Sequence, residues 1–121
     1  RIPTGIAPFA AVIDATGGTA YVSNLGGRPP RNGELFASPI QKPEEKIPVD
    51  ARGVASTGAV LRVDLKEGKV THTVATGLHP TAMAWHEASQ RLYVANGNSD
   101  TVSVIDTRSQ NVVGNIALQP F

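Results

Sequence analysis

The sequence predicts an all-β fold built from a unit of four short strands that occurs twice. Two stretches, 2–24 and 74–96, align without a gap at an offset of 72. A second pair, 58–76 and 100–118, aligns at an offset of 42. Between turn residues, the chain shows β-branched or alternating apolar runs in place of a helical period.

The eight expected strands are short, and each connection contains residues that favour turns. In chain order the strands are 9–14, 19–24, 59–65, 70–75, 81–86, 91–96, 101–106 and 112–118. The two offsets differ by about 30 residues, so the first copy carries an extra segment and the unit itself has about 42 residues. This length is typical of a four-stranded β-propeller blade. The sequence therefore predicts a β-propeller segment of about two four-stranded antiparallel blades.

The alignment also predicts how the chain is divided. Ile2 aligns with Val74, which belongs to the last strand of a unit, so we expect the chain to be a segment of a longer protein. The expected parts are the last strand of a preceding blade with an inter-blade loop (1–8), a first blade (9–76) and a second blade (77–121).

A Pro-rich insertion, 25–55, interrupts the first unit between its second and third strands. It holds five of the nine prolines. Proline removes a backbone donor, so a central strand is not expected there. Connections this long are usually functional or disordered, and the sequence leaves both possibilities open.

Composition excludes several classes of function. The net charge is +1, without the basic excess of a nucleic-acid binder, so no nucleic-acid partner is expected. The absence of Cys excludes disulfides, thiolate metal sites and Cys nucleophiles. No apolar stretch reaches the ~18–20 residues of a membrane span.

Few residues have the spacing that catalysis or metal binding requires. The three histidines, His72, His79 and His86, form neither a His-x-His nor a His-x-x-x-His pair. Serine-nucleophile elbows and phosphate-binding loops are also missing from the sequence. We therefore expect no catalytic residue, no metal site and no cofactor in this chain.

The residues that recur are assigned to packing and turns. Asp64 and Asp106 precede tight turns, where a carboxylate can accept backbone N–H bonds. Trp85 and Met83 are expected in the core. The recurring structural positions are Gly5, Pro8, Tyr21, Asp64, Gly77, Pro80, Tyr93 and Asp106.

One face is the expected binding face. In an up-and-down sheet alternate connections share an edge, so the insertion should lie beside the loops 5–8 and 77–80. Loops on a rigid scaffold are where binding residues concentrate. The candidate ligand-binding residues on this face are Arg28, Arg31, His79, Asn24 and Asn96.

Each candidate also has a structural interpretation. His79 stands where the first copy has Ala7, so it is either a surface loop residue or a ligand contact. The recurrence of Asn24 and Asn96 favours a loop-closing role. The two arginines suit phosphate or carboxylate, but nearby acidic residues nearly balance their charge, which favours a solvated loop.

The repeated segments resemble a known family. Tyr93-Val94-Ala95-Asn96, followed by a strand that ends Val104-Ile105-Asp106, is similar to the YVTN-type β-propeller repeat, and Tyr21-Val22-Ser23-Asn24 resembles a second copy. Members include bacterial surface-layer and secreted propellers, lactonase-like propellers and propellers fused to a phosphoesterase domain. The resemblance implies a periplasmic or extracellular location.

Two functions follow as hypotheses. The first is a non-enzymatic scaffold or binding surface within a larger bacterial secreted or surface protein. The alternative is part of a lactonase-like propeller hydrolase or of a propeller–phosphoesterase fusion, with His79 or Arg28 contributing to the site. The expected partners are the remaining blades or a second copy, and a protein, glycan or small-molecule ligand.

Overall fold

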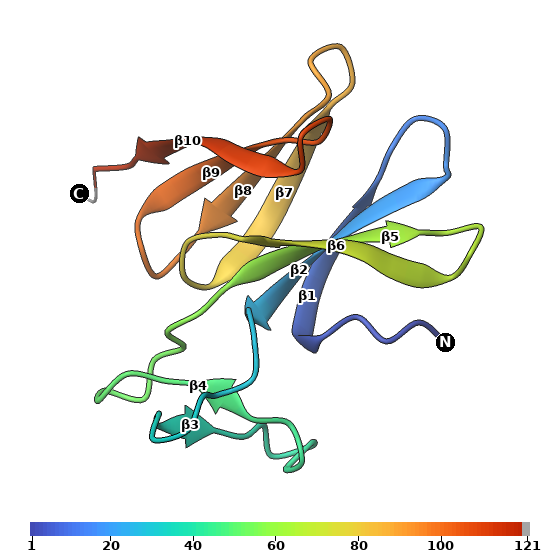
Figure 1. Cartoon of the computed structure of the whole chain (residues 1–121). Coiled ribbons are helices and arrows are strands. Elements are labelled where there is room, and N and C mark those ends of the chain that lie inside the picture. The colour runs from blue at the N-terminus through green and yellow to red at the C-terminus, as the bar shows by residue number, and fades with distance from the viewer. Residues whose placement is uncertain (120–121) are drawn as a thin grey trace.

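The computed structural model describes residues 1–119, which contain ten β-strands and no helix (Figure 1). Blade 1 is an antiparallel sheet in the order β1 (Ile6–Ile13), β2 (Thr19–Gly26), β5 (Ala59–Asp64) and β6 (Lys69–Ala75). Blade 2 comprises β7 (Pro80–His86), β8 (Arg91–Asn96), β9 (Thr101–Asp106) and β10 (Asn111–Ala117). The predicted all-β fold with two four-stranded antiparallel blades is confirmed.

The N-terminal part differs from the expectation for 1–8. Residues 1–5 form no strand, and Ile6–Pro8 belong to β1 of blade 1. The reason is the length of β2, which continues to Gly26 and pairs there with Ile6. At the other end, residues 120–121 of the expected second blade lie outside the described residues.

The two blades share a backbone irregularity at the same place. The pairing of β1 with β2 shifts between Pro8 and Ala11, and that of β7 with β8 shifts between Pro80 and Met83. In both blades the proline pairs with the asparagine that ends the second strand, as Pro8 with Asn24 and Pro80 with Asn96. The repeat therefore specifies a β-bulge as well as the strands.

The hydrophobic core lies between the blades. Tyr21, Val60 and Val74 of blade 1 pack against the second blade's Leu92, Val94 and Ile105. Tyr21 also stacks on Trp85, with ring centroids 5.7 Å apart. Leu92 and Val94 are fully buried, and Trp85 and Met83 lie against the cluster as partly buried residues, in agreement with their expected core role.

The two blades approach each other mainly through the first strand of blade 2 and the first two strands of blade 1. β7 lies against β1 and β2, whereas the last strands β6 and β10 have little contact. Ser23 Oγ donates to the carbonyl of Thr81 across this boundary, at 3.0 Å. Figure 1 shows the two sheets diverging from their first strands, as blades do around a propeller axis.

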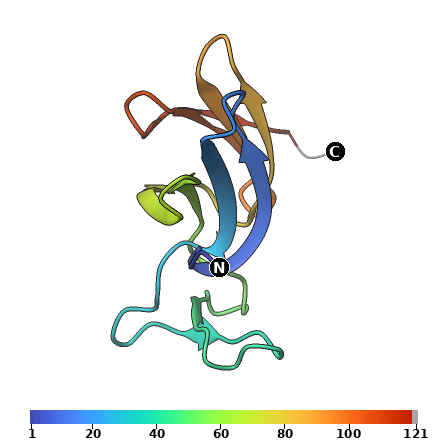
Figure 2. The same ribbon diagram turned by 90° about the vertical axis from the view of Figure 1, so that its right-hand side faces the viewer.

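The tight turns lie at the edge away from the insertion. Asp64 Oδ1 accepts from the backbone N–H of Glu67 at 2.9 Å, and Asp106 Oδ1 accepts from that of Arg108 at 3.0 Å. Both aspartates therefore fix turns. The insertion projects from the opposite edge, at the bottom of Figures 1 and 2.

Candidate functional site

The insertion is folded, and it forms its own small sheet. β3 (Phe36–Ala37) pairs with β4 (Ile47–Pro48), and Val49 bridges to Ala55. Asp50 closes the second turn, since its Oδ1 accepts from the N–H groups of Arg52 and Val54 at 2.9 and 3.0 Å. The sequence did not predict this hairpin. Each of its strands has only two residues, which is too short for an alternating apolar pattern.

Three glycines hold the base of the insertion against residues 76–79, the inter-blade loop that joins β6 to β7. A Cβ on Gly27 would lie 2.7 Å from the carbonyl oxygen of Gly58. A Cβ on Gly58 would collide with the carbonyl oxygen of Gly77 and lie 2.7 Å from Pro80 Cδ. The start of the insertion, its end and the inter-blade loop therefore approach backbone to backbone, which only glycine allows. Neither Gly27 nor Gly58 recurs in the second unit, so the repeat gave no signal for them.

The recurring glycine of each inter-blade loop has a different role in each blade. Gly5 has a φ of 86°, a conformation that residues with a Cβ rarely adopt. Gly77 is required by space, because a Cβ there would lie 2.6 Å from Ser99 Oγ and 2.7 Å from the Asn96 side chain.

The two candidate asparagines lie inside the protein. Asn24 and Asn96 are each 1% exposed. Asn96 Nδ2 donates to Ser103 Oγ at 2.9 Å and to Thr101 Oγ1 at 3.2 Å, while Asn24 Nδ2 donates to the carbonyl of Val22. The Asn96 bonds cross the connection 97–100 and close it, whereas the Asn24 bond stays within β2. In both asparagines Oδ1 has no hydrogen-bond partner among the described residues.

Arg28 is engaged within the insertion. Its Nη1 and Nη2 atoms each donate to one carboxylate oxygen of Glu34, both at 2.7 Å. The backbone N–H of Arg31 donates to the same carboxylate at 2.7 Å. The Arg28 hydrogen bonds and, after them, the Arg31 N–H lower the pKa of Glu34 to about 2. The structure thus places Arg28 and Arg31 at one carboxylate, with Arg28 as a structural ion pair.

His79 lies in the inter-blade loop in a left-handed conformation, with a φ of 56°. Its counterpart Ala7 has the same conformation, with a φ of 53°. The carbonyl of His79 accepts from the N–H of Gly97 at 3.1 Å, and its ring lies 6.4 Å from that of Phe9. The backbone conformation of His79 is therefore a property of the repeat.

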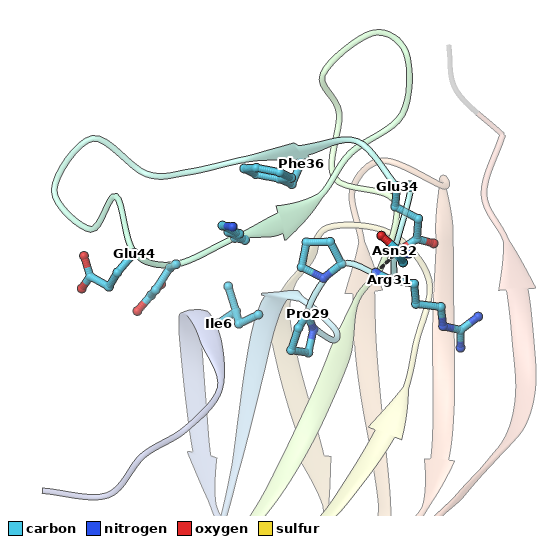
Figure 3. A pocket seen from close by; sticks show the side chains of 11 residues that line it. Ile6, Pro29, Arg31, Asn32, Glu34, Phe36 and Glu44 are labelled. Atoms are coloured by element: carbon cyan, nitrogen blue, oxygen red, sulfur yellow. Dashed lines mark hydrogen bonds between the residues drawn. The ribbon is translucent and has the colours of Figure 1, made fainter.

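A pocket of about 540 Å³ lies between the insertion and the edge of blade 1 (Figure 3). Ile6 and Pro29 form its blade side, Phe36 lies opposite them, and Glu44 stands at one end. The Arg31 guanidinium points away from the cavity in this view. The lining joins an apolar floor to a charged rim, and its volume is in the range of small-molecule pockets.

Glu45, at the far end of the pocket, is paired within the insertion and lies near blade 1. Lys42 donates to Glu45 at 2.8 Å and is the main cause that lowers the pKa of Glu45. The backbone N–H of Ala7 contributes to the same lowering. Lys46 Nζ lies 4.6 Å from the centre of the Phe36 ring, a cation–π arrangement. These pocket residues had no sequence signal, since the insertion has no counterpart in the second unit.

The part of the chain that the structure describes, residues 1–119, has neither a cluster of metal ligands nor a membrane-spanning helix. No three His, Asp or Glu side chains in this range are grouped so that they could hold a metal ion. The same residues include no helix with the length and apolarity needed to cross a membrane.

Comparison with solved structures shows likeness in fold. The whole chain superposes on hydrazine synthase from Kuenenia stuttgartiensis with a TM-score of 0.65 and 24% identity, and covers 26% of that chain. The chain thus spans about a quarter of this structure. At this level of identity the likeness supports the assignment of the two sheets as β-propeller blades and concerns the fold alone.

Two further structures are more distant. The dihydro-heme d1 dehydrogenase NirN has a TM-score of 0.47 and 12% identity over 93% of this chain and 28% of its own. A Bacteroides fragilis protein described as a 6-phosphogluconolactonase has a TM-score of 0.42 and 17% identity over 98% of this chain and 41% of its own. No family model and no curated protein matches the chain.

Proposed function

We propose that the chain is a non-enzymatic β-propeller segment that presents a binding surface within a larger bacterial secreted or surface protein. The observation that carries the proposal is the folded insertion, which docks on the glycine contacts at the blade edge and encloses a pocket of about 540 Å³ with Ile6. The similarity of Tyr93–Asn96 and Tyr21–Asn24 to YVTN-type repeats supports a periplasmic or extracellular location.

The pocket lining supports a polar ligand with an apolar face, such as a glycan of the cell wall. The ring of Phe36 is 51% exposed. Glu44 and Asn32, at opposite ends of the pocket, supply hydrogen-bonding groups. An apolar surface with a few polar groups that fix orientation is the usual composition of a small-molecule site.

The test replaces residues 25–58 by Gly-Asn-Ser-Asp, the sequence of 97–100 that makes the equivalent connection in blade 2. The probes are a glycan array and sedimentation with purified peptidoglycan. We expect the intact chain to bind one of the two probes and the loop-swapped chain to bind neither, while both give the same near-ultraviolet spectrum from Trp85. Equal binding by both chains, or binding by neither, would overturn the proposal.

The hydrolase alternative is tested on the intact chain, with lactone and phosphoester substrates. His79→Ala is a suitable variant because Ala7 already adopts the same left-handed conformation in blade 1. Hydrolysis that is lost in His79→Ala would replace the non-enzymatic proposal by the alternative.

A further inference from the structure

We propose that Asn32 is a site of spontaneous deamidation, at which the chain converts a neutral amide into a carboxylate without an enzyme. Asn32 and Gly33 form an exposed turn just before β3, and both line the pocket between the insertion and blade 1. The inference goes beyond the proposed function, since it concerns a reaction of the chain with water and needs no ligand.

The sequence offers this reaction at two places. Two of the six asparagines, Asn32 and Asn96, are followed by glycine. Asparagine is one of the chemically labile residues of proteins. A following glycine favours the reaction, because it has no Cβ to hinder the approach of its nitrogen. The sequence alone therefore does not distinguish Asn32 from Asn96.

Water is the only other reactant. The backbone nitrogen of Gly33 gives up its proton and attacks Cγ of Asn32, so that an N–Cγ bond forms, the Cγ–Nδ2 bond breaks and ammonia leaves with the proton. Water then opens the resulting succinimide ring. Attack of water at Cγ gives aspartate, and attack at the backbone carbonyl carbon gives isoaspartate, in which the main chain runs through the former side chain.

The turn at Asn32 leaves both reacting groups unengaged. Its hydrogen bonds join the flanking residues: the N–H of Glu34 donates to the carbonyl of Arg31 at 3.1 Å, and the N–H of Arg31 donates to the Glu34 carboxylate at 2.7 Å. Among the described residues, neither the Asn32 amide nor the N–H of Gly33 has a hydrogen-bond partner. A Cβ on Gly33 would have no atom of a non-neighbouring residue within 4 Å, so the turn has space to move. The attack therefore costs no hydrogen bond of the two reacting groups.

The second pair is held in place. Asn96 is 1% exposed, and its Nδ2 donates to Ser103 Oγ and Thr101 Oγ1 at 2.9 and 3.2 Å. The N–H of Gly97 donates to the carbonyl of His79 at 3.1 Å. Attack on Cγ would break these bonds, so this pair reacts only when the sheet opens locally. The same dipeptide is thus reactive in the insertion and protected in blade 2.

The product changes the rim of the pocket. Asn32 lies at the end opposite Glu44 (Figure 3). Its amide can both donate and accept hydrogen bonds, whereas a carboxylate only accepts. The formal net charge of the chain falls by one from +1. A ligand group that accepts from the Asn32 amide would therefore lose its donor as the protein ages.

Glu34, two residues further along, reports the new charge. Its pKa of about 2 depends first on the Arg28 hydrogen bonds and then on the N–H of Arg31. A second carboxylate nearby disfavours the charged form of Glu34. Isoaspartate also lengthens the main chain of the turn that carries the Arg31 N–H. Both effects raise the pKa of Glu34, so its NMR midpoint should move up in the converted chain.

Peptide mass spectrometry of the folded chain, incubated at neutral pH in water enriched in heavy oxygen, tests the proposal. We expect Asn32 to exchange its amino group for a hydroxyl that carries heavy oxygen, and Asn96 to convert at least about tenfold more slowly. The rate at Asn32 should rise with pH, because the attacking nitrogen must lose its proton. Asn32→Gln is the matched variant and should not convert, since its longer side chain would have to close a larger ring.

The unfolded chain in urea is the control for the effect of the fold. There Asn32 and Asn96 should convert at similar rates, because the dipeptide is the same and the bonds of Asn96 are lost. The proposal is overturned if Asn32 does not convert in the folded chain, if both pairs convert equally there, or if the preference for Asn32 is as large in urea. The mass readout involves no ligand, so failure of glycan binding and failure of conversion are separate results.

Discussion

At the scale of single residues, the recurring prolines and asparagines occupy equivalent backbone positions in both blades. Asn24 and Asn96 are buried, and Pro8 and Pro80 pair with them at a bulge. The differences between the copies are also explained locally. His79 and Ala7 share one left-handed conformation, so the backbone does not require the imidazole.

The glycine contact leads to a prediction on stability. In Gly58→Ala the new Cβ would collide with the carbonyl of Gly77, and we expect the free energy of unfolding to fall by about 1–3 kcal/mol. Gly97→Ala is the matched control, because the nearest atom to its Cβ would be 3.7 Å away, and its effect should stay within about 0.5 kcal/mol. Urea denaturation measures both, and equal stability of the two variants would contradict the three-glycine contact.

At the scale of elements, the blades and the insertion are stabilised by different forces. The blades are joined by apolar packing between sheets, whereas the insertion is held by short turns, ion pairs and the glycine contact at its base. Arg52 pairs with Asp50 and lowers the pKa of that carboxyl, as Arg28 does for Glu34. Of the four carboxyls in residues 1–119 with a lowered pKa, three lie in the insertion and one, Asp14, lies in blade 1, so we expect the insertion to respond to acid more than the blades.

The acid response of the insertion can be stated with its sign. Glu34 has a pKa of about 2 in the folded chain, against an ordinary value of 4.5 for a glutamate side chain. Its ion pair with Arg28 therefore contributes stability above about pH 4.5, and this contribution is lost as the pH falls towards 2. Carboxyl ¹³C NMR should give a Glu34 midpoint near 2 in the parent and a clearly higher one in Arg28→Gln.

The same titration should be followed by amide exchange. Residues of β3 and β4 should exchange faster below pH 4.5 relative to those of β8, after correction for intrinsic rates. An unshifted Glu34 midpoint in the parent would show that the pair does not persist in solution.

At the scale of the whole molecule, each blade supplies half of one core. Tyr21 and Val60 come from blade 1, while Leu92 and Ile105 come from blade 2, so this cluster is not complete within either sheet. In repeat folds stability resides in such neighbour interfaces.

A chain cut after Thr76 should therefore lose cooperative folding. It keeps all four strands of blade 1 but lacks the partners of Tyr21 and Val60. Circular dichroism should show a cooperative thermal transition for the full chain and a gradual, non-cooperative change for the shortened one. A sharp transition of residues 1–76 alone would show that one blade is a sufficient folding unit.

The strands, their order and the core role of Trp85 could be predicted because they depend on spacing within a repeated unit. The same applies to the turn-capping aspartates, whose bonds reach only two or three residues along the chain. The pocket could not be predicted. Its lining joins Ile6 to Phe36 and Glu44, which are brought together by contacts distant in sequence.

The sequence by itself determined two antiparallel blades, the edge from which the insertion projects and the residues that recur for packing. Only the tertiary structure decided that the insertion folds and that Gly27, Gly58 and Gly77 meet at its base. The physical reason is that periodicity records local pairing, which repeats with the strands. Docking of an aperiodic segment depends instead on shape and charge complementarity between distant parts of the chain.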